Sequence, residues 1–581
     1  MKYNKPNTCI PPSTQYLLFI NKMAYNNVTI LITTTTLLLT LLINTIITNA
    51  NKLHQGTKPN IVVMFVDDLG YGDVGFINPE TKETPLIDAI AKKSLVLTDF
   101  HAGASVCTPS RAALLTGRLG LRTGINKNFG PTSLYGLSIN ETTIPEYLGK
   151  YGGYYTGGMG KWHLGMHAPY HPSYRFDYYL GIPYSLDMGC TDNPGANLPP
   201  VEKCPKGENT IIFNKKKTIE NAINYYDAPP APDSRVALPL FESYRNCSGR
   251  TCNEDIIQQP VDLTTVTDYY INNTKTIILN AQKEKKPFFI YLPFSHVHVP
   301  LATDPKFTNT SARGNVFGDV LMELDHAVHS VVETVEELAG KGNTLIIFTA
   351  DNGPWNSKCD LAGSQAQFLG KWQETHGGGG GTGKFTLWEG GHREPFFAYW
   401  PGKIKPRIDH TTIGSTFDFL PTFLSLAGIS LPTDRSFDGV SLEKVFFADD
   451  DVHSNNNESP PLLREFLFHS EIVVGTLNAM RYKDLKLFFR SYPAVDCHGR
   501  SKKGITHGFD TPLVFNLTAD PAESNPITIH PDILLKCQNA YKDKLHDIQN
   551  TPYSIPSYAT GGFYDGPCCD KDRPVCRCKW D

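Results

Sequence analysis

The sequence predicts an α/β fold in which helices cover both faces of a mostly parallel β-sheet. Apolar runs typical of buried strands recur at 60–73, 287–300 and 343–353, and each run ends in polar residues. Between the last two runs, residues 318–342 carry apolar side chains at helical spacing and stop at glycine. Strands that alternate with helices favour a parallel sheet, whose ligand site lies at the carboxyl ends of its strands.

The remaining elements continue this alternation. Residues 84–94 are predicted to form a helix, 95–103 a strand, and 143–152 a helix that ends at glycine. Residues 185–260 are rich in Pro, Asn and Cys, and are predicted to be a loop-rich insertion. The run GGGGGTG at 377–383 predicts a flexible or closely approached loop.

The length of 581 residues predicts more than one domain. After about residue 425 the pattern changes to shorter strand-like runs such as REFLFHSEIV and DLKLFFRSY. We therefore predict a main domain at 58–425 and a smaller α+β domain at 426–581. The net charge of −4 lacks the basic surplus of nucleic-acid-binding proteins, so no nucleic acid is expected as a partner.

Residues 1–50 indicate entry into the secretory pathway. The segment 30–47 is apolar apart from its threonines and one asparagine, and the small residue in 48–50 offers a cleavage point. A cleaved signal peptide and an uncleaved membrane anchor both fit this length, and the threonines favour cleavage. Glycosylation sequons support the same route and begin at Asn140, Asn246, Asn272, Asn309, Asn457 and Asn516.

The cysteines also suit an oxidising compartment. Among the thirteen, Cys190 stands near Cys204 and Cys247 near Cys252. Four more lie in the tail CCDKDRPVCRC at 568–578. Such a tail can form disulfides or bind zinc, and disulfides are the expected use in a secreted protein.

Polar residues at the ends of two distant strands predict a metal site. Asp67 and Asp68 close one buried strand, and Asp351 and Asn352 close another. In one parallel sheet both pairs emerge at the same edge, where three carboxylates repel one another unless a cation joins them. Such oxygen ligands favour Ca²⁺ or Mg²⁺. Either pair alone fits helix caps or turn residues, but the matching positions favour the metal.

The stretch SVCTPSRAALLTGR at 105–118 places a cysteine at the start of a predicted helix. Pro109 suits the first helical position, so Cys107 would lie at the helix N-terminus, where free N–H groups attract anions. Arg111 follows one turn later. The residues leave four interpretations of Cys107 open: a disulfide partner, a buried thiol, a thiolate nucleophile, or the precursor of a more reactive group.

The sequence CTPSR at 107–111, followed by LLTGR, resembles the hallmark of type I sulfatases, whose cysteine is oxidised after translation to formylglycine. Other motifs stand in that family's order: DDLGYGD (67–73), GKWHLG (160–165), ADNG (350–353) and GKFTLWEGGHREP (383–395). The chain from Asn60 to its end is similar to the arylsulfatase A branch of the family. Three features carry that similarity: GIPYSLDMGC (181–190), LMELD (321–325) and the cysteine-dense tail.

The resemblance implies an alkaline-phosphatase-like fold, with a mixed, mostly parallel sheet sandwiched by helices and a smaller C-terminal α+β domain that carries an antiparallel sheet. It also implies a sulfuric ester hydrolase that uses formylglycine and a bound Ca²⁺, with Mg²⁺ as the alternative ion. The implied metal ligands are Asp67, Asp68, the modified Cys107, Asp351 and Asn352. The implied catalytic residues are Cys107, Arg111, Lys161, His163, Ser185, His298 and Lys384.

The resemblance further implies a role for each group. The hydrated aldehyde would use one hydroxyl to attack sulfur and the second to expel sulfate. Asp351 would take the proton of the nucleophile, His163 that of the second hydroxyl, and His298 would protonate the leaving alcohol. His296 matches a neighbouring family histidine and is left out of the catalytic set. The diol and the sulfate would be held by Arg111, Lys161, Ser185 and Lys384.

The expected substrate is a sulfate monoester: aryl sulfates in vitro and a sulfated galactolipid in vivo, with a sulfated glycosaminoglycan sugar such as N-acetylgalactosamine sulfate as the alternative. A phosphatase or phosphodiesterase of the same fold, and a glycoprotein that binds sulfated ligands without hydrolysis, also stay open. Expected partners are the formylglycine-generating enzyme during maturation and a second copy in a homo-oligomer, and the expected location is lysosomal or extracellular. In one departure from the family, Thr382 replaces a cysteine, so Cys359 is the candidate partner of Cys497.

Overall fold

A computed structural model describes most of the chain after the N-terminal segment. The described residues are 58–167, 169–191, 195–201, 203, 237–248, 251–448, 462–471, 476–499, 507–551, 554 and 557–561. The predicted signal peptide, Cys204, Asn457 and the cysteine-rich tail lie outside them, as do the side chains of residues 246–248 and 251–254. Residues Pro59–Asp581 form one compact unit.

The main sheet has ten strands in the described part of the chain. They are β1 (Asn60–Val66), β2 (Leu95–His101), β3 (Tyr155–Lys161), β4 (Tyr178–Ile182), β5 (Leu240–Ser248), β6 (Thr251–Gln258), β7 (Phe288–Pro293), β8 (Thr344–Ala350), β9 (Phe397–Tyr399) and β10 (Arg407–Ser415). Their order is β10-β2-β9-β8-β1-β7-β3-β4-β5-β6. β1 pairs in parallel with β7 and β8, whereas β9, β5 and β6 run antiparallel to their neighbours. The predicted mixed, mostly parallel sheet is confirmed.

The central strand β1 is apolar throughout because both of its faces are covered. Ile61, Val63 and Phe65 join the hydrophobic cluster on one face of the sheet. Val62 and Met64 join the cluster on the other face. A buried parallel strand therefore shows a continuous apolar run rather than an alternating one.

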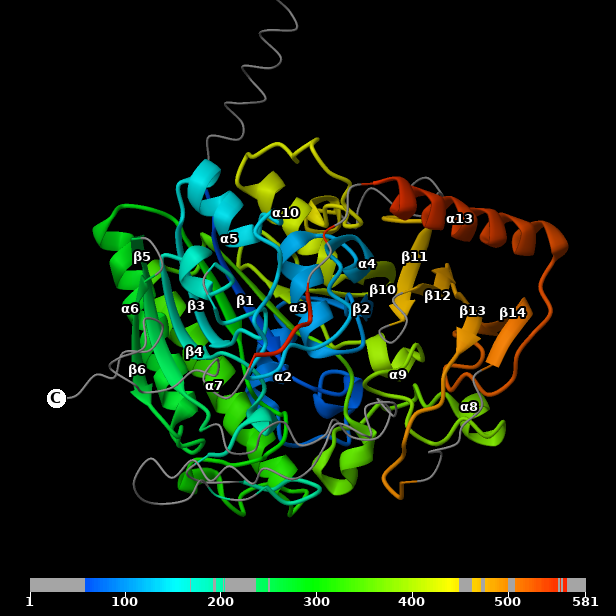
Figure 1. Cartoon of the computed structure of the whole chain (residues 1–581), viewed down its shortest axis with the longest axis horizontal. Helices are drawn as coiled ribbons and strands as arrows, with labels where there is room; N and C mark the ends of the chain where they lie inside the picture. Colours follow the sequence, from blue (N-terminus) through cyan, green and yellow to red (C-terminus); the bar gives the residue numbers. More distant parts are fainter. Residues whose placement is uncertain are drawn as a thin grey trace, which may run out of the picture. The chain divides into compact units, whose positions relative to one another are not determined.

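Helices cover both faces of this sheet (Figure 1). α2 (Pro85–Ala91), α6 (Val266–Lys283) and α7 (Val316–Ala339) contribute side chains to one cluster. α3 (Cys107–Thr116), α5 (Ile144–Tyr147) and α10 (Phe419–Leu426) contribute to the other. Further short α-helices among the described residues are α4 (Gly120–Thr123), α8 (Lys371–Thr375), α9 (Glu389–His392) and α11 (Glu443–Phe446).

Three local predictions differ from the structure. Within the predicted insertion at 185–260, β5 and β6 form an antiparallel hairpin that extends the sheet beyond β4, because their backbone groups pair with that open edge. α3 begins at Cys107 rather than at Pro109, since Val106 is extended and its carbonyl accepts the Ser110 N–H. The helix predicted at 143–152 divides into α5 and a π-helical turn.

A second sheet of four antiparallel strands follows, in the order β11-β12-β13-β14. Its strands are β11 (Phe466–Glu471), β12 (Thr476–Tyr482), β13 (Leu485–Ser491) and β14 (His507–Asn516), and α13 (Pro531–Asn550) packs on one face of it. This antiparallel sheet is the one that the family resemblance implied. The boundary between 425 and 426 remains a prediction.

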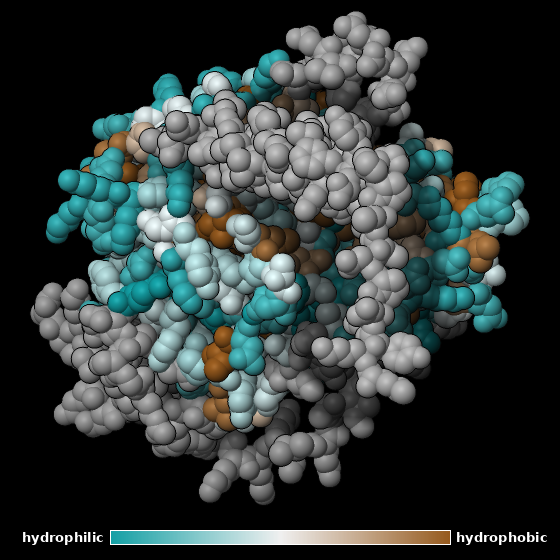
Figure 2. Space-filling view, turned by 90° about the horizontal axis from the view of Figure 1, so that it is seen from above, coloured by the Kyte–Doolittle hydropathy of each residue, from teal (hydrophilic) through white to brown (hydrophobic). Residues whose placement is uncertain are grey.

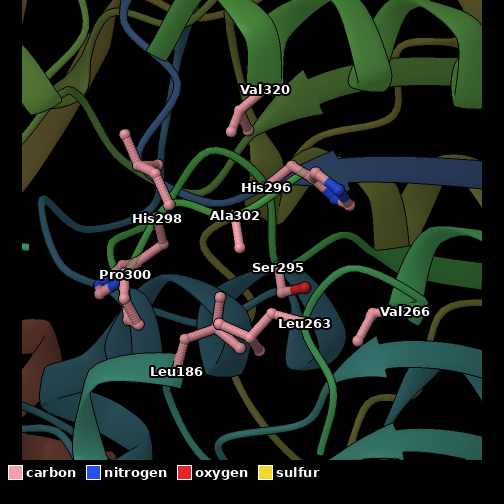
Figure 3. Close-up of a pocket in the computed structure, with 10 residues that line it drawn as sticks. Leu186, Leu263, Val266, Ser295, His296, His298, Pro300, Ala302 and Val320 are labelled. Carbon is pink, nitrogen blue, oxygen red and sulfur yellow. The ribbon is translucent and has the colours of Figure 1, made fainter. Parts of the chain in front are cut away.

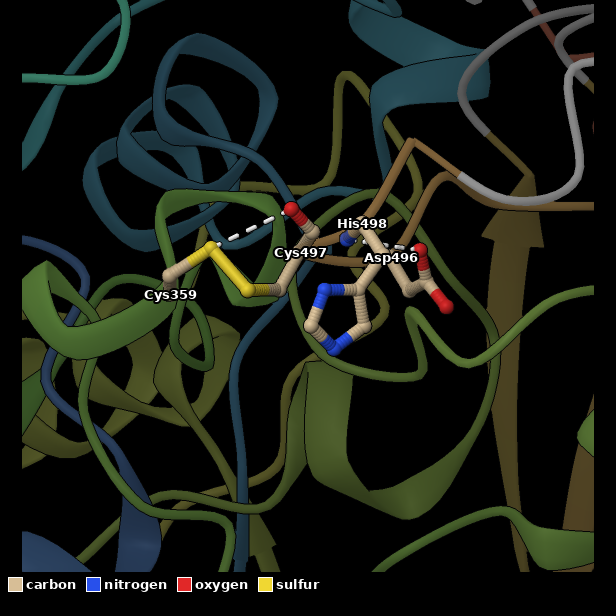
Figure 4. The surroundings of a disulfide bond; sticks show 4 residues. All are labelled: Cys359, Asp496, Cys497 and His498. Carbon is tan, nitrogen blue, oxygen red and sulfur yellow. Dashed lines mark hydrogen bonds between the residues drawn. A yellow bond between two sulfur atoms is a disulfide. The ribbon is translucent and has the colours of Figure 1, made fainter.

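A disulfide joins the loop after β13 to the 3-10 helix Asn356–Leu361, which follows β8. Cys359 and Cys497 are bonded, with 4.8 Å between their Cα atoms (Figure 4). The pairing named from the sequence is thus the one found. Cys190 is also disulfide-bonded.

The described surface resembles that of an ordinary globular protein. On the face in Figure 2, hydrophobic residues lie in small patches among hydrophilic ones. Within the described ranges, no helix combines the length and the apolar character needed to cross a membrane. Three of the sequon asparagines, Asn140, Asn272 and Asn309, are exposed, and Asn516 is half-buried at the end of β14.

Candidate active site

The carboxyl ends of β1 and β8 bring two pairs of polar residues together. Val66 and Ala350 are paired in the parallel ladder, so the residues that follow them emerge side by side. The backbone N–H of Asp68 donates to Asp351 Oδ1 at 3.2 Å, and Asn352 Nδ2 donates to Asp68 Oδ1 at 2.7 Å. Asp68 has a positive φ of 57°, which turns its side chain out of the strand direction. The strand-end cluster expected from the sequence is present.

Three buried cations surround these carboxylates. Lys161, the last residue of β3, donates to Asp67 Oδ2 at 2.5 Å. Lys384 donates to both carboxylate oxygens of Asp68, at 2.6 and 2.8 Å. Arg111, on α3, pairs with Asp351 at 2.6 Å and also lies 3.4 Å from Asp67. The site therefore holds carboxylates that can bind a cation and positively charged side chains that can bind an anion.

Cys107 lies at the centre of this arrangement as the first residue of α3. Its side chain is fully buried, is not in a disulfide, and has its Sγ 3.6 Å from Asp67 Oδ1. Burial raises the pKa of the Cys107 thiol to about 12, although Lys161 and Lys384 act in the opposite direction. The free Sγ argues against the disulfide interpretation. The unmodified side chain is a neutral thiol near pH 7, which argues against the thiolate interpretation.

Ser185 and His298 complete one wall of the site. Ser185 Oγ accepts from Lys161 Nζ at 3.0 Å and lies 3.3 Å from His298 Nε2. His298 Nδ1 lies 2.5 Å from the Val299 carbonyl, so Nδ1 carries a proton and Nε2 faces Ser185 and Asp68. Burial and the nearby charge of Lys384 lower the pKa of His298.

His163 lies two residues beyond the end of β3. The strand ends at Lys161, and His163 adopts a positive φ of 57°. Its Nε2 lies 2.9 Å from the Phe129 carbonyl, while its buried Nδ1 has no hydrogen-bond partner among the described residues. Burial and the charge of Lys161 hold the pKa of His163 well below its usual value, so the ring is neutral with a free basic nitrogen.

His296 is separated from the site although it lies two residues from His298. Its Nε2 lies 2.9 Å from Thr267 Oγ1, on α6, rather than facing the carboxylates. Burial lowers the pKa of His296 to about 4. His296, Ser295 and His298 border a small cavity (Figure 3). Its other walls are apolar and include Leu263, Val266 and Val320.

The buried charges in the site shift one another's pKa values. Burial disfavours the ionised Asp67, but the charges of Lys161 and His298 outweigh it and hold the pKa of Asp67 well below its usual value. Burial and the charge of Asp67 raise the pKa of Asp351 to about 7, against the effect of Arg111.

The residues present fit a divalent cation. Asn352 Oδ1 is buried and has no hydrogen-bond partner among the described residues, although buried oxygens are normally satisfied. Ligand atoms of Asp67, Asp68, Cys107 and His298 all lie within 4.8 Å of one another. Carboxylate and amide oxygens are the ligands that Ca²⁺ and Mg²⁺ prefer, so this cluster can hold such an ion. His298 was not among the ligands expected from the sequence.

All residues predicted for the site lie in this one cluster: Asp67, Asp68, Cys107, Arg111, Lys161, His163, Ser185, His298, Asp351, Asn352 and Lys384. Sequence reasoning missed its neighbours Asp187, Trp355 and Lys358. The available signal was position, because Trp355 follows the ADNG strand end by two residues and Asp187 follows Ser185 by two.

Known proteins share this chain's sequence and fold. The profile of the sulfatase family matches residues 59–429, and that of the C-terminal region of aryl-sulfatase matches residues 463–578. Arylsulfatase G from Canis lupus familiaris is 41% identical over 90% of this chain and 92% of its own. Arylsulfatase A from Bos taurus is 35% identical over 84% of this chain and 82% of its own. The crystal structure of a sulfatase from Pseudoalteromonas sp. has a TM-score of 0.70 and 25% identity, over 88% of this chain and 94% of that one.

These matches agree with the motifs and with the geometry of the site. The arylsulfatase A branch expected from the motifs is among the relatives, and arylsulfatase G matches at higher identity. The family profiles cover both sheets and every residue of the cluster. The chain therefore belongs to the sulfatase family and is a sulfuric ester hydrolase.

Proposed function

We propose that this protein hydrolyses sulfate monoesters through a formylglycine hydrate formed from Cys107. The observation that carries the proposal is the setting of that one residue. Cys107 is a buried free cysteine at the meeting point of the strand-end carboxylates and the buried cations, within the motif that the family oxidises. A neutral buried thiol is a poor nucleophile, whereas a hydrated aldehyde offers two hydroxyl groups on one carbon.

The proposed reaction has two displacements. One hydroxyl oxygen of the hydrate attacks sulfur while its proton passes to Asp351. The bond between sulfur and the substrate oxygen breaks, and His298, protonated on both ring nitrogens when the substrate is bound, gives its Nε2 proton to the leaving alcohol. The second hydroxyl then gives its proton to His163 Nδ1, the C–O bond to sulfate breaks, and the aldehyde and free sulfate form. Water adds to the aldehyde and restores the hydrate.

The charged side chains stabilise the transition state of each displacement. Lys161, Lys384 and Arg111 are buried and already oriented by the carboxylates, so they can face the sulfate oxygens without reorganising. Ser185 Oγ lies between Lys161 and His298, which places a hydroxyl near the sulfate. Arg111 steadies the diol.

A divalent cation completes the proposed site. Asp67, Asp68, Asp351, Asn352 and the modified residue 107 would hold it, and we propose Ca²⁺, with Mg²⁺ as the alternative. Such an ion supplies positive charge that offsets the sulfate oxygens. The ligand set consists of hard oxygen donors, which argues against the two-zinc sites of related phosphatases.

The proposed natural substrate is a sulfated galactolipid or a sulfated sugar, and aryl sulfates are the expected test substrates. We also propose passage through the secretory pathway to a lysosomal or extracellular site, with removal of the N-terminal segment. The formylglycine-generating enzyme would act on the chain during maturation, and the mature protein would form a homo-oligomer. The exposed sequons Asn140, Asn272 and Asn309 are compatible with glycans.

Mass spectrometry and one matched pair of variants test the proposal. The peptide that contains residue 107 should carry an aldehyde in protein from a secretory host. Cys107→Ala should abolish sulfate release from 4-nitrophenyl sulfate and leave the unfolding temperature nearly unchanged. Cys537→Ala, which removes a second buried free cysteine among the described residues, should retain activity. An intact thiol in active protein, or turnover by Cys107→Ala, would refute the mechanism.

A further inference from the structure

We infer that Trp355 and Asp187 form the subsite for the alcohol part of the substrate, and that this part is a hydroxyl-bearing sugar ring. The inference rests on the proposed function, because it takes His298 as the acid that protonates the leaving oxygen. It assigns two specificity-determining residues that lie outside the sulfate-binding cluster.

The position of Trp355 follows from the two groups that it touches. Its ring centroid lies 5.7 Å from that of His298, and Lys384 Nζ lies 4.7 Å from the centre of the indole. Lys384 faces the sulfate, and His298 faces the oxygen that leaves. Because both groups contact the indole, Trp355 borders the space that we assign to the alcohol.

The indole is held in place from two sides. Phe385 packs edge-on against it with 5.7 Å between ring centroids, and Lys358 Nζ lies 4.1 Å from its centre. Phe385 has a positive φ of 74° and is 38% exposed, although bulky residues rarely adopt this conformation. Such aromatic side chains that remain partly open beside a polar site are the usual platforms for ring-shaped ligands.

Lys358 acts as a positioning residue for this platform. It is only 5% exposed, and its ammonium group donates to Asn197 Oδ1 at 3.0 Å and to the Leu198 carbonyl at 2.6 Å. These bonds fasten the segment 195–201 beside Trp355. Lys358 and Trp355 also line one small cavity together with Asp68, so the platform and the metal-binding edge border the same space.

Asp187 supplies the polar side of the subsite. It lies in the short 3-10 helix Leu186–Met188, two residues after Ser185. Its Oδ1 atom is buried and has no hydrogen-bond partner among the described residues. Burial opposes its charge, but the nearby His298 and Lys384 lower the pKa of Asp187, so it stays ionised. A buried carboxylate oxygen that lacks a donor is suited to accept a hydrogen bond from a substrate hydroxyl.

The chemistry of the two residues favours a sugar over a purely apolar alcohol. One face of a pyranose ring presents C–H groups that pack on an aromatic ring, and its edge presents hydroxyl groups that donate to a carboxylate. The competing location is the cavity beyond His298, which is lined mainly by apolar side chains (Figure 3). Two of its polar groups are paired, His296 Nε2 with Thr267 and Ser295 with Tyr270, and His296 Nδ1 has no partner among the described residues.

Substrate discrimination by variants of the matured enzyme tests the inference. Sulfate release is measured on 4-nitrophenyl sulfate and on a panel of galactose and glucosamine monosulfates. Asp187→Asn should lower kcat/KM on the best sugar sulfate by about tenfold or more relative to its effect on the aryl sulfate, which offers no hydroxyl group to Asp187. Trp355→Ala should lower kcat/KM on both, because both rings pack on the indole, and Trp355→Phe should recover most of the loss. Tyr151→Ala, which removes an aromatic side chain that is 56% exposed, is the control.

The outcomes separate the two proposals. Equal effects of Asp187→Asn on both substrates, or full activity of Trp355→Ala, would overturn the subsite. Leu263→Trp fills the cavity beyond His298. If it lowers kcat/KM on sugar sulfates more than Asp187→Asn and Trp355→Ala do, the alcohol lies in that cavity instead. If the wild type hydrolyses the aryl sulfate but none of the sugar sulfates, the subsite is also overturned and the proposed function stays intact. Failure of the wild type on every substrate would refute the proposed function itself.

Discussion

At the scale of single residues, two histidines show how spacing alone leaves roles undecided. His296 and His298 stand two apart after β7, and a strand would present both on one face. The chain turns between them, so His298 meets Ser185 and Asp68 whereas His296 meets Thr267. The two positions therefore provide a matched pair within one segment.

We predict that His298→Gln lowers kcat/KM on alkyl sulfates by about 10²-fold or more, because it removes the acid that we propose to protonate the leaving oxygen. The loss should be smaller on 4-nitrophenyl sulfate, whose leaving group needs little protonation. His296→Gln should stay within about threefold of the wild type on both substrates. Steady-state kinetics on the two substrate classes give the answer, and equal losses in the two variants would contradict the assigned roles.

At the scale of elements, the start of α2 is capped by a distant helix. Asp325, on α7, accepts hydrogen bonds from the backbone N–H groups of Leu86 at 3.1 Å and Ile87 at 2.7 Å. These N–H groups belong to the first turn of α2 and have no partner within their own helix. Burial raises the pKa of Asp325 to about 7 in spite of these bonds. The LMELD motif thus contains a contact that holds α2 against α7.

We predict that Asp325 makes stability depend on pH. The carboxyl group of Asp325 stays protonated up to about pH 7 in the folded protein, whereas in an unfolded chain it loses its proton near pH 4. The stabilising effect of the proton is therefore complete below pH 4 and is lost as the pH rises through 7. Asp325→Asn should remove this dependence, seen as a flatter unfolding temperature between pH 4.5 and 7.5. Asp532→Asn, at a side chain 89% exposed on α13, should leave the curve unchanged.

At the scale of the whole molecule, buried charges join the two sheets. Arg481, on β12, donates to both oxygens of Asp99, on β2, at 3.0 and 2.9 Å. Lys486, on β13, donates to Glu389 of α9 at 2.8 Å. Removing one member of such buried pairs leaves an uncompensated charge, which typically costs about 3–5 kcal/mol. The second sheet is therefore attached by polar contacts as well as by apolar packing.

Three buried histidines lie in this junction, and we predict that they limit stability in acid. Burial lowers the pKa of His101 to about 4 and that of His392 to about 3, and holds that of His469 well below its usual value. An unfolded chain takes up these protons below about pH 6.5, so stability is lost as the pH falls from there towards 4. The charged groups that face them are Asp99, Glu389, Arg393, Arg481 and Lys486, and Glu523 lies behind Lys486 and Glu389.

Denaturant unfolding at pH 7 and pH 5 measures this effect. His469→Gln should reduce the difference in midpoint between the two pH values, because one fewer group takes up a proton on unfolding. His546→Gln, at an exposed position on α13, is the control and should keep the full difference. If His469→Gln leaves the difference in unfolding midpoint between pH 7 and pH 5 unchanged, these rings do not set the stability in acid.

Much of the fold could be read from the sequence because its signals are local. The apolar runs of β1, β7 and β8 are continuous since both faces of the sheet are covered, and α7 shows a helical apolar stripe. The hairpin of β5 and β6 lies within the segment predicted to be loop-rich, because its residues are polar and its pairing depends on the open edge of β4. Edge strands carry weak patterns, so only the neighbouring strand identifies them.

The sequence by itself determined the chemistry that this protein can perform: the strand-end acids, the cysteine in its motif, and the lysines and histidines that accompany them. Those residue types define the donors and acceptors wherever the chain places them. Only the tertiary structure decided which groups meet: that Lys384 pairs with Asp68, that His296 contacts Thr267 instead of the carboxylates, and that Trp355 packs beside His298. The physical reason is that these contacts join residues far apart in the chain, and packing rather than local propensity sets the distances between them.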